Sequence, residues 1–175
     1  CFIGRWDPQK RVELFFKLAM KFPHIKFIVI GKGYNEIRNS YLKKRYSKLP
    51  NVTILGLVPD EIKFKVLEKS WILVNTSIRE ALPITFLEAC AVGIPIITTT
   101  IGDTLEWIDN KVGYVTPPTP HALAEAMYMI ISHNDLRRRF SSNCIKIVRS
   151  EFSLEKIVNK LEKIYNEIIE NKVSN

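Results

Sequence analysis

The chain has 175 residues, of which 46% are hydrophobic and 25% charged, and its formal net charge is +8. Such a composition is typical of one soluble globular domain, and the absence of any apolar run of about eighteen residues excludes a transmembrane helix. The positive charge is compatible with polyanions, membrane surfaces or phosphorylated small molecules, and equally with a surface of solvated lysines.

Cysteines and histidines are few and scattered, which argues against a disulfide framework or a metal site. They are Cys1, Cys90, Cys144, His24, His121 and His133. The sequence therefore predicts a cytoplasmic protein that binds no metal and whose histidines are surface or structural residues. We expect no nucleic-acid partner.

Six short apolar runs rich in β-branched residues are predicted strands, at residues 1–4, 25–31, 52–56, 71–77, 94–100 and 113–116. They lack polar alternation, which favours strands buried on both faces. Helical spacing of apolar residues follows each of the first three strands, at Val12, Phe15, Phe16 and Ala19, at Ile37, Tyr41 and Leu42, and at Ile62, Val66 and Leu67.

Strands that alternate with helices predict an α/β fold, a doubly wound parallel six-stranded sheet with flanking helices. We expect one domain over residues 1–175. Its first predicted strand begins at Cys1, in the middle of a buried pattern, so the natural protein is expected to continue upstream.

After residue 117 the pattern becomes wholly helical. One apolar stripe comprises Leu123, Ala126, Met127 and Ile130, and a later one comprises Leu154, Ile157, Val158, Leu161, Ile164, Tyr165 and Ile168. Both follow the three-four spacing of an amphipathic helix, whose apolar face must be buried somewhere.

The loop after the first strand carries two cations five residues apart, Arg5 and Lys10. In a doubly wound sheet, ligands bind at the carboxyl ends of the strands, which is where this loop is predicted to lie. The guanidinium of Arg5 suits phosphate oxygens as a planar fork, and Lys10 supplies a mobile point charge.

The loop after the second strand, Gly31-Lys32-Gly33, partly resembles a dinucleotide-binding fingerprint. It lacks a third glycine, because Glu36 occupies that position, and it follows the second recognisable strand. A tight turn that needs glycine is the simpler interpretation, with a minor role beside a phosphate left open.

The segment from residue 75 to residue 95 is the most informative. Glu80 follows a strand, Pro83 suits a first helical position, and Glu88 falls about one turn further along the helix. Free N–H groups at Ile84, Thr85 and Phe86 would form an anion site at the helix start. Two carboxylates beside such a site suit hydroxyl groups on either side of a diphosphate, as a nucleotide sugar has on its ribose and its hexose.

At these residues the chain resembles the C-terminal, donor-binding domain of family-four glycosyltransferases of the GT-B fold. Glu80 and Glu88 match the E-x7-E signature of that family. The remaining similarity is an ordered series through Gly4-Arg5, Lys10, Gly31-Lys32-Gly33, residues 52–56, 80–89 and 93–96, Gly102 to Glu106, residues 113–115 and Phe152-Ser153.

The resemblance implies roles for these residues. Arg5 and Lys10 would hold the diphosphate and stabilise the leaving nucleotide, and Glu80 would contact the transferred sugar; these three are the predicted catalytic residues. Glu88 would accept hydrogen bonds from the ribose hydroxyls. The predicted nucleotide-sugar site is completed by Gly4, Gly31, Gly33, Gly56, Leu57, Val58, Leu82, Ile84 and Thr85, with the backbone at 56–58 near the base.

The resemblance further implies a retaining transferase that uses a UDP- or GDP-sugar, without cofactor or metal. An N-terminal domain that binds the acceptor would be the missing partner, and a lipid-linked acceptor could bring the enzyme to a membrane surface. Ala81, Pro83 and Asp103 depart from glycines that are common in the family, which leaves the sugar open. A nucleotide-binding module without catalysis and an NAD-dependent oxidoreductase domain are the alternatives.

In GT-B enzymes the closing helix commonly packs on the N-terminal domain. By that resemblance, the end of the last helix is expected to be frayed, or to cover its apolar face against a second copy. The alternative is that the helix packs entirely on its own sheet.

Overall fold

Six parallel strands are present in the computed structural model, which describes residues 1–99 and 105–173, with side chains described up to residue 99 and from 106 to 169. One sheet has the order β1-β2-β3 and the other the order β4-β5-β6. The strands are β1 (Phe2–Ile3), β2 (Phe27–Ile30), β3 (Val52–Gly56), β4 (Leu73–Asn75), β5 (Ile96–Thr98) and β6 (Gly113–Val115).

The predicted single six-stranded sheet is therefore wrong in one respect, since the strands form two three-stranded sheets. The division falls between β1 and β4, which are not paired in a common ladder. Cys1 joins the sheets there. Its amine donates to the carbonyl of Ile72 at 2.7 Å, and its own carbonyl accepts from the N–H of Val74 at 2.8 Å.

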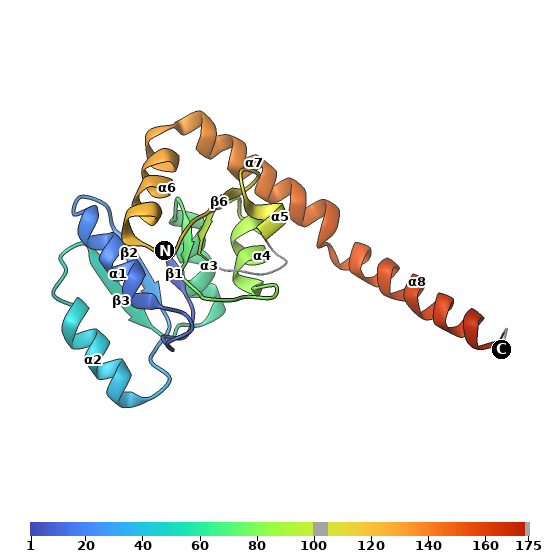
Figure 1. Cartoon of the computed structure of the whole chain (residues 1–175), viewed down its shortest axis with the longest axis horizontal. Helices are drawn as coiled ribbons and strands as arrows, with labels where there is room; N and C mark the ends of the chain where they lie inside the picture. Colours follow the sequence, from blue (N-terminus) through green and yellow to red (C-terminus); the bar gives the residue numbers. More distant parts are fainter. Residues whose placement is uncertain (100–104, 174–175) are drawn as a thin grey trace.

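Both faces of this layer are covered by helices (Figure 1). The helices are α1 (Val12–Lys21), α2 (Glu36–Tyr46), α3 (Asp60–Lys69), α4 (Ile84–Ala91), α5 (Leu105–Ile108), α6 (Pro120–Ser132), α7 (Asn134–Glu151) and α8 (Leu154–Val173). Side chains that alternate along a strand point to opposite faces. Phe2 and Val74 accordingly join the core under α1 and α6, while Leu73 joins the core under α4 and α7. The doubly wound α/β class is confirmed.

The helix after β2 buries a different face from the one predicted. Ile37 and Tyr41 of α2 are 84% and 52% exposed, whereas Asn39, Leu42 and Tyr46 are buried. The polar Asn39 is buried because its side-chain oxygen accepts a hydrogen bond from the backbone N–H of Gly33. The spacing of apolar residues alone cannot predict that the buried face of a helix contains an asparagine.

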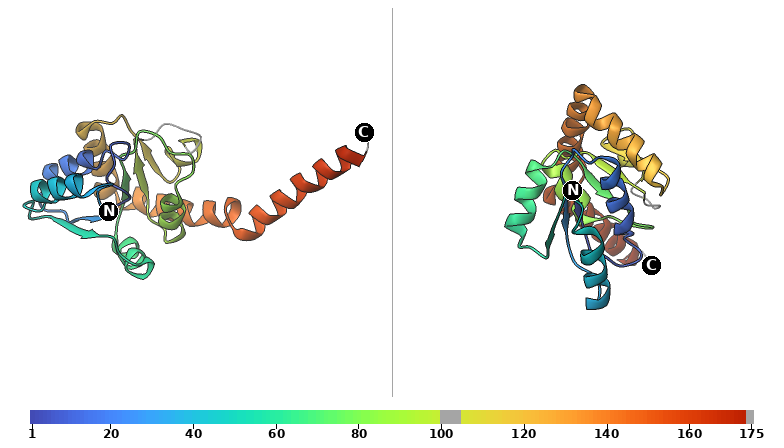
Figure 2. Two further views of the ribbon diagram at one scale, coloured as in Figure 1. Left: turned by 90° about the horizontal axis from the view of Figure 1, so that it is seen from below. Right: turned by 90° about the vertical axis from the view of Figure 1, so that its left-hand side faces the viewer.

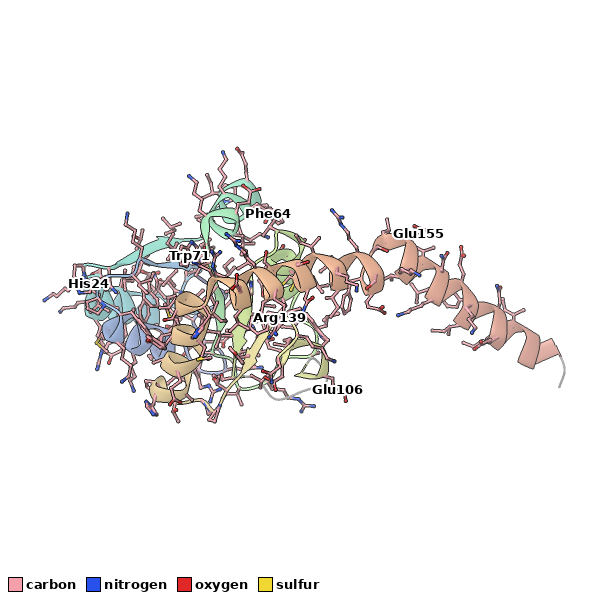
Figure 3. The ribbon with its side chains drawn as sticks, turned by 90° about the horizontal axis from the view of Figure 1, so that it is seen from above. His24, Phe64, Trp71, Glu106, Arg139 and Glu155 are labelled. Carbon is pink, nitrogen blue, oxygen red and sulfur yellow. The ribbon has the colours of Figure 1, made fainter. Side chains whose placement is uncertain are left out.

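The last helix projects away from the rest of the chain, with the C-terminus at its far end (Figures 1 and 2), and Glu155 marks its beginning in Figure 3. Its apolar stripe is exposed, from 79% at Leu154 to 40% at Ile157 and Val158. The alternative that this helix packs entirely on its own sheet is therefore wrong. No helix within the described ranges combines the length and apolar character that crossing a lipid bilayer requires.

Hydrogen exchange is expected to be much faster over residues 160–172 than in the core strands of a dilute monomer. A helix without tertiary packing is marginally stable in water. The ion pair between Lys163 and Glu167 is exposed, at 3.9 Å, and such pairs stabilise a helix by only a few tenths of a kcal/mol. Protection that rises with protein concentration would indicate pairing of copies. Core-like protection in a monodisperse monomer would contradict both expectations.

Candidate functional site

Two loops that leave the carboxyl ends of β1 and β4 lie against each other. The N–H of Ile78 donates to the carbonyl of Gln9 at 2.8 Å, and the hydroxyl of Thr76 donates to the carbonyl of Lys10 at 2.7 Å. These contacts exist because β1 and β4 meet at Cys1, so that their following loops emerge side by side. The edge predicted to bind a ligand is therefore formed by segments about 70 residues apart in the chain.

Arg11 links the same two loops through hydrogen bonds. It was not predicted as a site residue. Its backbone is left-handed, with φ 45°, and its guanidinium donates to the carbonyls of Thr76 and Ser77 and to the hydroxyl of Thr99 at 2.8–2.9 Å. Burial lowers the pKa of Arg11 from its ordinary value. No sequence signal distinguishes this arginine from a solvated one, because its partners come from two other loops.

Glu80 lies at the centre of the contact between the loops. One carboxylate oxygen accepts from the ammonium of Lys10 and the hydroxyl of Ser77, both at 2.5 Å, and from the side-chain amide of Asn75 at 3.2 Å. Burial alone would raise the pKa of Glu80, but the three hydrogen bonds outweigh it and leave the pKa below its ordinary value. Glu80 is therefore an ionised carboxylate with a fixed orientation.

The two predicted phosphate-binding cations are in separate ion pairs. The side chain of Lys10 is 23% exposed and bound to Glu80, whereas that of Arg5 is 77% exposed and lies 3.3 Å from Asp7. A second oxygen of Asp7 accepts from the backbone N–H of Lys10 at 3.0 Å, which shapes the loop between the cations. Their joint role in binding phosphate stays a prediction.

Glu88, which lies on α4, also forms an ion pair with a lysine. Its Oε1 accepts from the ammonium of Lys63 on α3 at 2.6 Å, and Lys63 contacts Asp60 at 2.9 Å as well. Burial would lower the pKa of Lys63, but the hydrogen bonds that its ammonium donates to the two carboxylates outweigh it and raise the pKa. Sequence reasoning missed Lys63, since a lysine in the first turns of a polar helix looks solvated.

The start of α4 differs slightly from the prediction. Pro83 is the residue before the helix and Ile84 is the first within it. The N–H of Phe86 is not free for an anion, because it donates to the carbonyl of Pro83 at 2.9 Å. Leu82 and Ile84 are exposed and Thr85 is partly exposed, so the helix start is open to a ligand.

Packing alone accounts for the two glycines after β2. A β-carbon on Gly31, which has φ +127°, would lie 1.9 Å from the carbonyl oxygen of Gly4, and one on Gly33 would lie 2.5 Å from the N–H nitrogen of Asn39. Gly31 thus lets the end of β2 approach the loop that carries Arg5. The tight-turn interpretation of this motif is confirmed.

The predicted base-binding backbone follows β3. Gly56 has φ +74°, Leu57 is 67% exposed and Val58 is half-buried. Gly56 is tied to β2, since its carbonyl accepts from the N–H of Gly31 at 2.7 Å. This segment leads directly into α3, which carries Lys63.

Part of the predicted site cannot be compared with the fold. Gly102 and Asp103, which we expect to flank the ligand after the fifth strand, lie outside the described residues. Within the described ranges, no group of three or more His, Cys, Asp or Glu side chains is arranged to hold a metal ion. His24, His121 and His133 are exposed.

The clearest apolar cavity does not coincide with these residues. A cavity of about 490 Å³ lies at the opposite, amino-terminal end of the strands, between Cys1, Phe15, Trp71 and Met127. It contains none of the paired carboxylates. Lys10 and Glu80 lie instead in the loops that follow β1 and β4, at the carboxyl ends of these strands.

Comparisons with known proteins identify the family of this chain. The family model described as "Glycosyl transferases group 1" matches residues 1–147. The chain is 26% identical over 140 residues to a subunit of the phosphatidylinositol N-acetylglucosaminyltransferase of Arabidopsis thaliana, a match that covers 74% of this chain and 31% of that protein.

Two solved structures share the fold. One is Alr3699/HepE of Anabaena in complex with UDP, with TM-score 0.83 and 18% identity, covering 95% of this chain and 48% of that one. The other is the C-terminal domain of a group 1 family glycosyl transferase, LpcC, from Francisella tularensis, with TM-score 0.69 and 20% identity, covering 87% and 85%. The chain thus spans about half or less of the longer proteins that it matches, and most of an isolated C-terminal domain.

Proposed function

The chain belongs to the glycosyl transferases group 1 family, and we propose that it is the part of a retaining glycosyltransferase that binds a nucleotide-sugar donor. The observation that carries this proposal is the placement of Glu80 and Glu88. Both lie at the carboxyl-end edge of the sheet, and each is ionically paired with a lysine from another segment.

The chemistry of this edge suits group transfer from a diphosphate. When the bond between sugar and diphosphate breaks, negative charge develops on the leaving nucleotide. In our proposal, Lys10 moves from Glu80 to the diphosphate, and the exposed Arg5 joins it. Glu80, freed from the lysine but still held by Ser77 and Asn75, then accepts from a hydroxyl of the transferred sugar.

Glu88 serves the other end of the donor in this proposal. It would accept from the ribose hydroxyls, while the backbone at 56–58 faces the base. UDP is present in the Anabaena structure that shares this fold, which favours a uridine nucleotide among the donors to test. A guanosine nucleotide is the next choice.

The complete enzyme needs an acceptor site, and we assign that site to a further, N-terminal domain. The Arabidopsis relative is named for a phosphatidylinositol substrate, which supports a lipid-linked acceptor at a membrane surface. The net charge of +8 would favour attraction to such a surface.

A panel of nucleotides tests the proposed function by thermal unfolding. If UDP or GDP binds with a dissociation constant of ~100 μM, a 1 mM dose stabilises the fold by about 1.4 kcal/mol. We expect the unfolding midpoint to rise by roughly 3–6 °C in a chain of this length. A shift with NAD and none with UDP, GDP, ADP or dTDP would exclude the donor-binding function and favour an oxidoreductase domain.

Substitutions at the two glutamates should distinguish binding of the nucleotide from binding of the sugar. Glu88→Ala should weaken UDP and the UDP-sugar alike, whereas Glu80→Ala should weaken the UDP-sugar more than UDP. Arg5→Ala should cost ~1.5–3 kcal/mol of affinity for both ligands, the scale of a charge-assisted hydrogen bond. Titration calorimetry measures all three. An Arg5→Ala protein that binds UDP as tightly as the parent would remove the phosphate role of Arg5.

A further inference from the structure

The two oxygens of the Glu88 carboxylate have different surroundings. Oε1 accepts from the ammonium of Lys63 at 2.6 Å. Oε2 is buried, and no group among the described residues donates to it. A buried carboxylate oxygen without a donor is unfavourable, because it has lost its hydrogen bonds to water. The orientation that Lys63 imposes therefore leaves one strong acceptor without a donor among the described residues.

Lys63 is itself held in one place. Its ammonium lies between Glu88 and Asp60, 2.6 and 2.9 Å from their oxygens, and 5.0 Å from the ring centroid of Phe64, which Figure 3 labels on α3. Its side chain is only 16% exposed. Three interactions thus fix the ammonium, and it fixes Oε1 in turn.

We propose that Lys63 is the positioning residue of the nucleotide site: it binds one oxygen of Glu88 so that the other accepts a ribose hydroxyl. The inference rests on the proposed function, since it takes a ribonucleotide as the ligand. A hydrogen bond from a hydroxyl to a carboxylate is charge-assisted and therefore strong. Affinity for the ribose would then depend on a residue that never touches the ligand.

A purely structural role is the competing explanation. The pair between Lys63 and Glu88 links α3 to α4, and its loss could loosen both helices. The two explanations differ in what they predict for a ligand without ribose hydroxyls. Loosened helices would weaken every nucleotide, whereas a misplaced Glu88 would weaken only those that carry the hydroxyls.

The test compares UDP and GDP with their 2′,3′-dideoxy analogues in the parent, in Lys63→Met and in Lys63→Arg. The control is Lys65→Met, on the same helix, where the lysine forms an exposed pair with Glu61. Dissociation constants come from calorimetry, and thermal unfolding verifies that each variant is folded. The arginine variant restores the charge and covers the case in which Lys63→Met does not fold.

For whichever of UDP and GDP the parent binds, we expect Lys63→Met to weaken the ribonucleotide roughly tenfold and to leave the dideoxy analogue within about twofold, as loss of one hydrogen bond to a charged group implies. Lys63→Arg should recover most of the loss, and Lys65→Met should bind as the parent does. Equal weakening of both ligands, or no change, would overturn the role of Lys63 while leaving the proposed function intact. A parent that binds none of UDP, GDP, ADP and dTDP would overturn both.

Discussion

Gly31→Ala is expected to lower the midpoint of thermal unfolding by roughly 4–24 °C. At φ +127° an alanine is strained whatever space surrounds it, and its β-carbon would lie 1.9 Å from the carbonyl oxygen of Gly4. Backbone strain of this kind costs about 1–3 kcal/mol and forced repacking a further ~1–3 kcal/mol. Each kcal/mol corresponds to roughly 2–4 °C in a domain of this size.

Gly56→Ala is the matched control for this prediction. Gly56 also has a positive φ, +74°, but nothing lies within 4 Å of the β-carbon that alanine would add. Only the backbone strain of about 1–2 kcal/mol should remain, which lowers the midpoint by roughly 2–8 °C. Calorimetry of the two variants measures the difference. Equal midpoints would show that the close approach of Gly31 to Gly4 is not required.

The second large effect is a loss of stability on mild acidification when the chain begins at Cys1 with a free amine. Cys1 as a residue is partly exposed, yet its amine lies at the joint between the sheets, and burial lowers the pKa of this amine from 8.0 to about 5. Between these pH values the unfolded chain binds a proton that the folded chain does not. Stability is therefore highest above pH 8 and falls as the pH decreases to 5, by up to about 4 kcal/mol.

Acetylation of the amine isolates this effect from other titrating groups. The amide that it creates keeps an N–H that can donate to the carbonyl of Ile72, but it carries no titratable proton. Urea unfolding from pH 5 to pH 8.5 should show a steep decline of stability toward pH 5 for the free amine, and a clearly shallower one for the acetylated chain. Parallel curves would mean that the amine remains hydrated in the folded chain.

The sequence alone determined the class of fold. Runs of β-branched residues without polar alternation identified all six strands. The expected burial on both faces is wrong for β3, whose side chains alternate between half-buried and exposed. The strand order and the Cys1 joint were not predictable in detail. They depend on which segments adjoin in space, which no local pattern records.

Glu80, Glu88 and Lys10 were selected from the sequence as candidates, because ligands bind at the loops and helix starts that follow parallel strands, and their roles stay predictions. Their ion-pair partners were not predicted. Lys10 meets Glu80 across 70 residues and Lys63 meets Glu88 across 25, and such pairings follow from which loops and helices adjoin in space.

For the helices, too, the sequence determined some features and the tertiary structure decided the others. Three-four spacing predicted where α1 and α6 bury their apolar faces, since both pack on the sheet. It failed for α2, where the buried face includes Asn39, and it could not decide what α8 packs against. Local periodicity determines which face of a helix is apolar. Only the tertiary structure decides whether another element covers that face, because covering it depends on contacts between segments far apart in the chain.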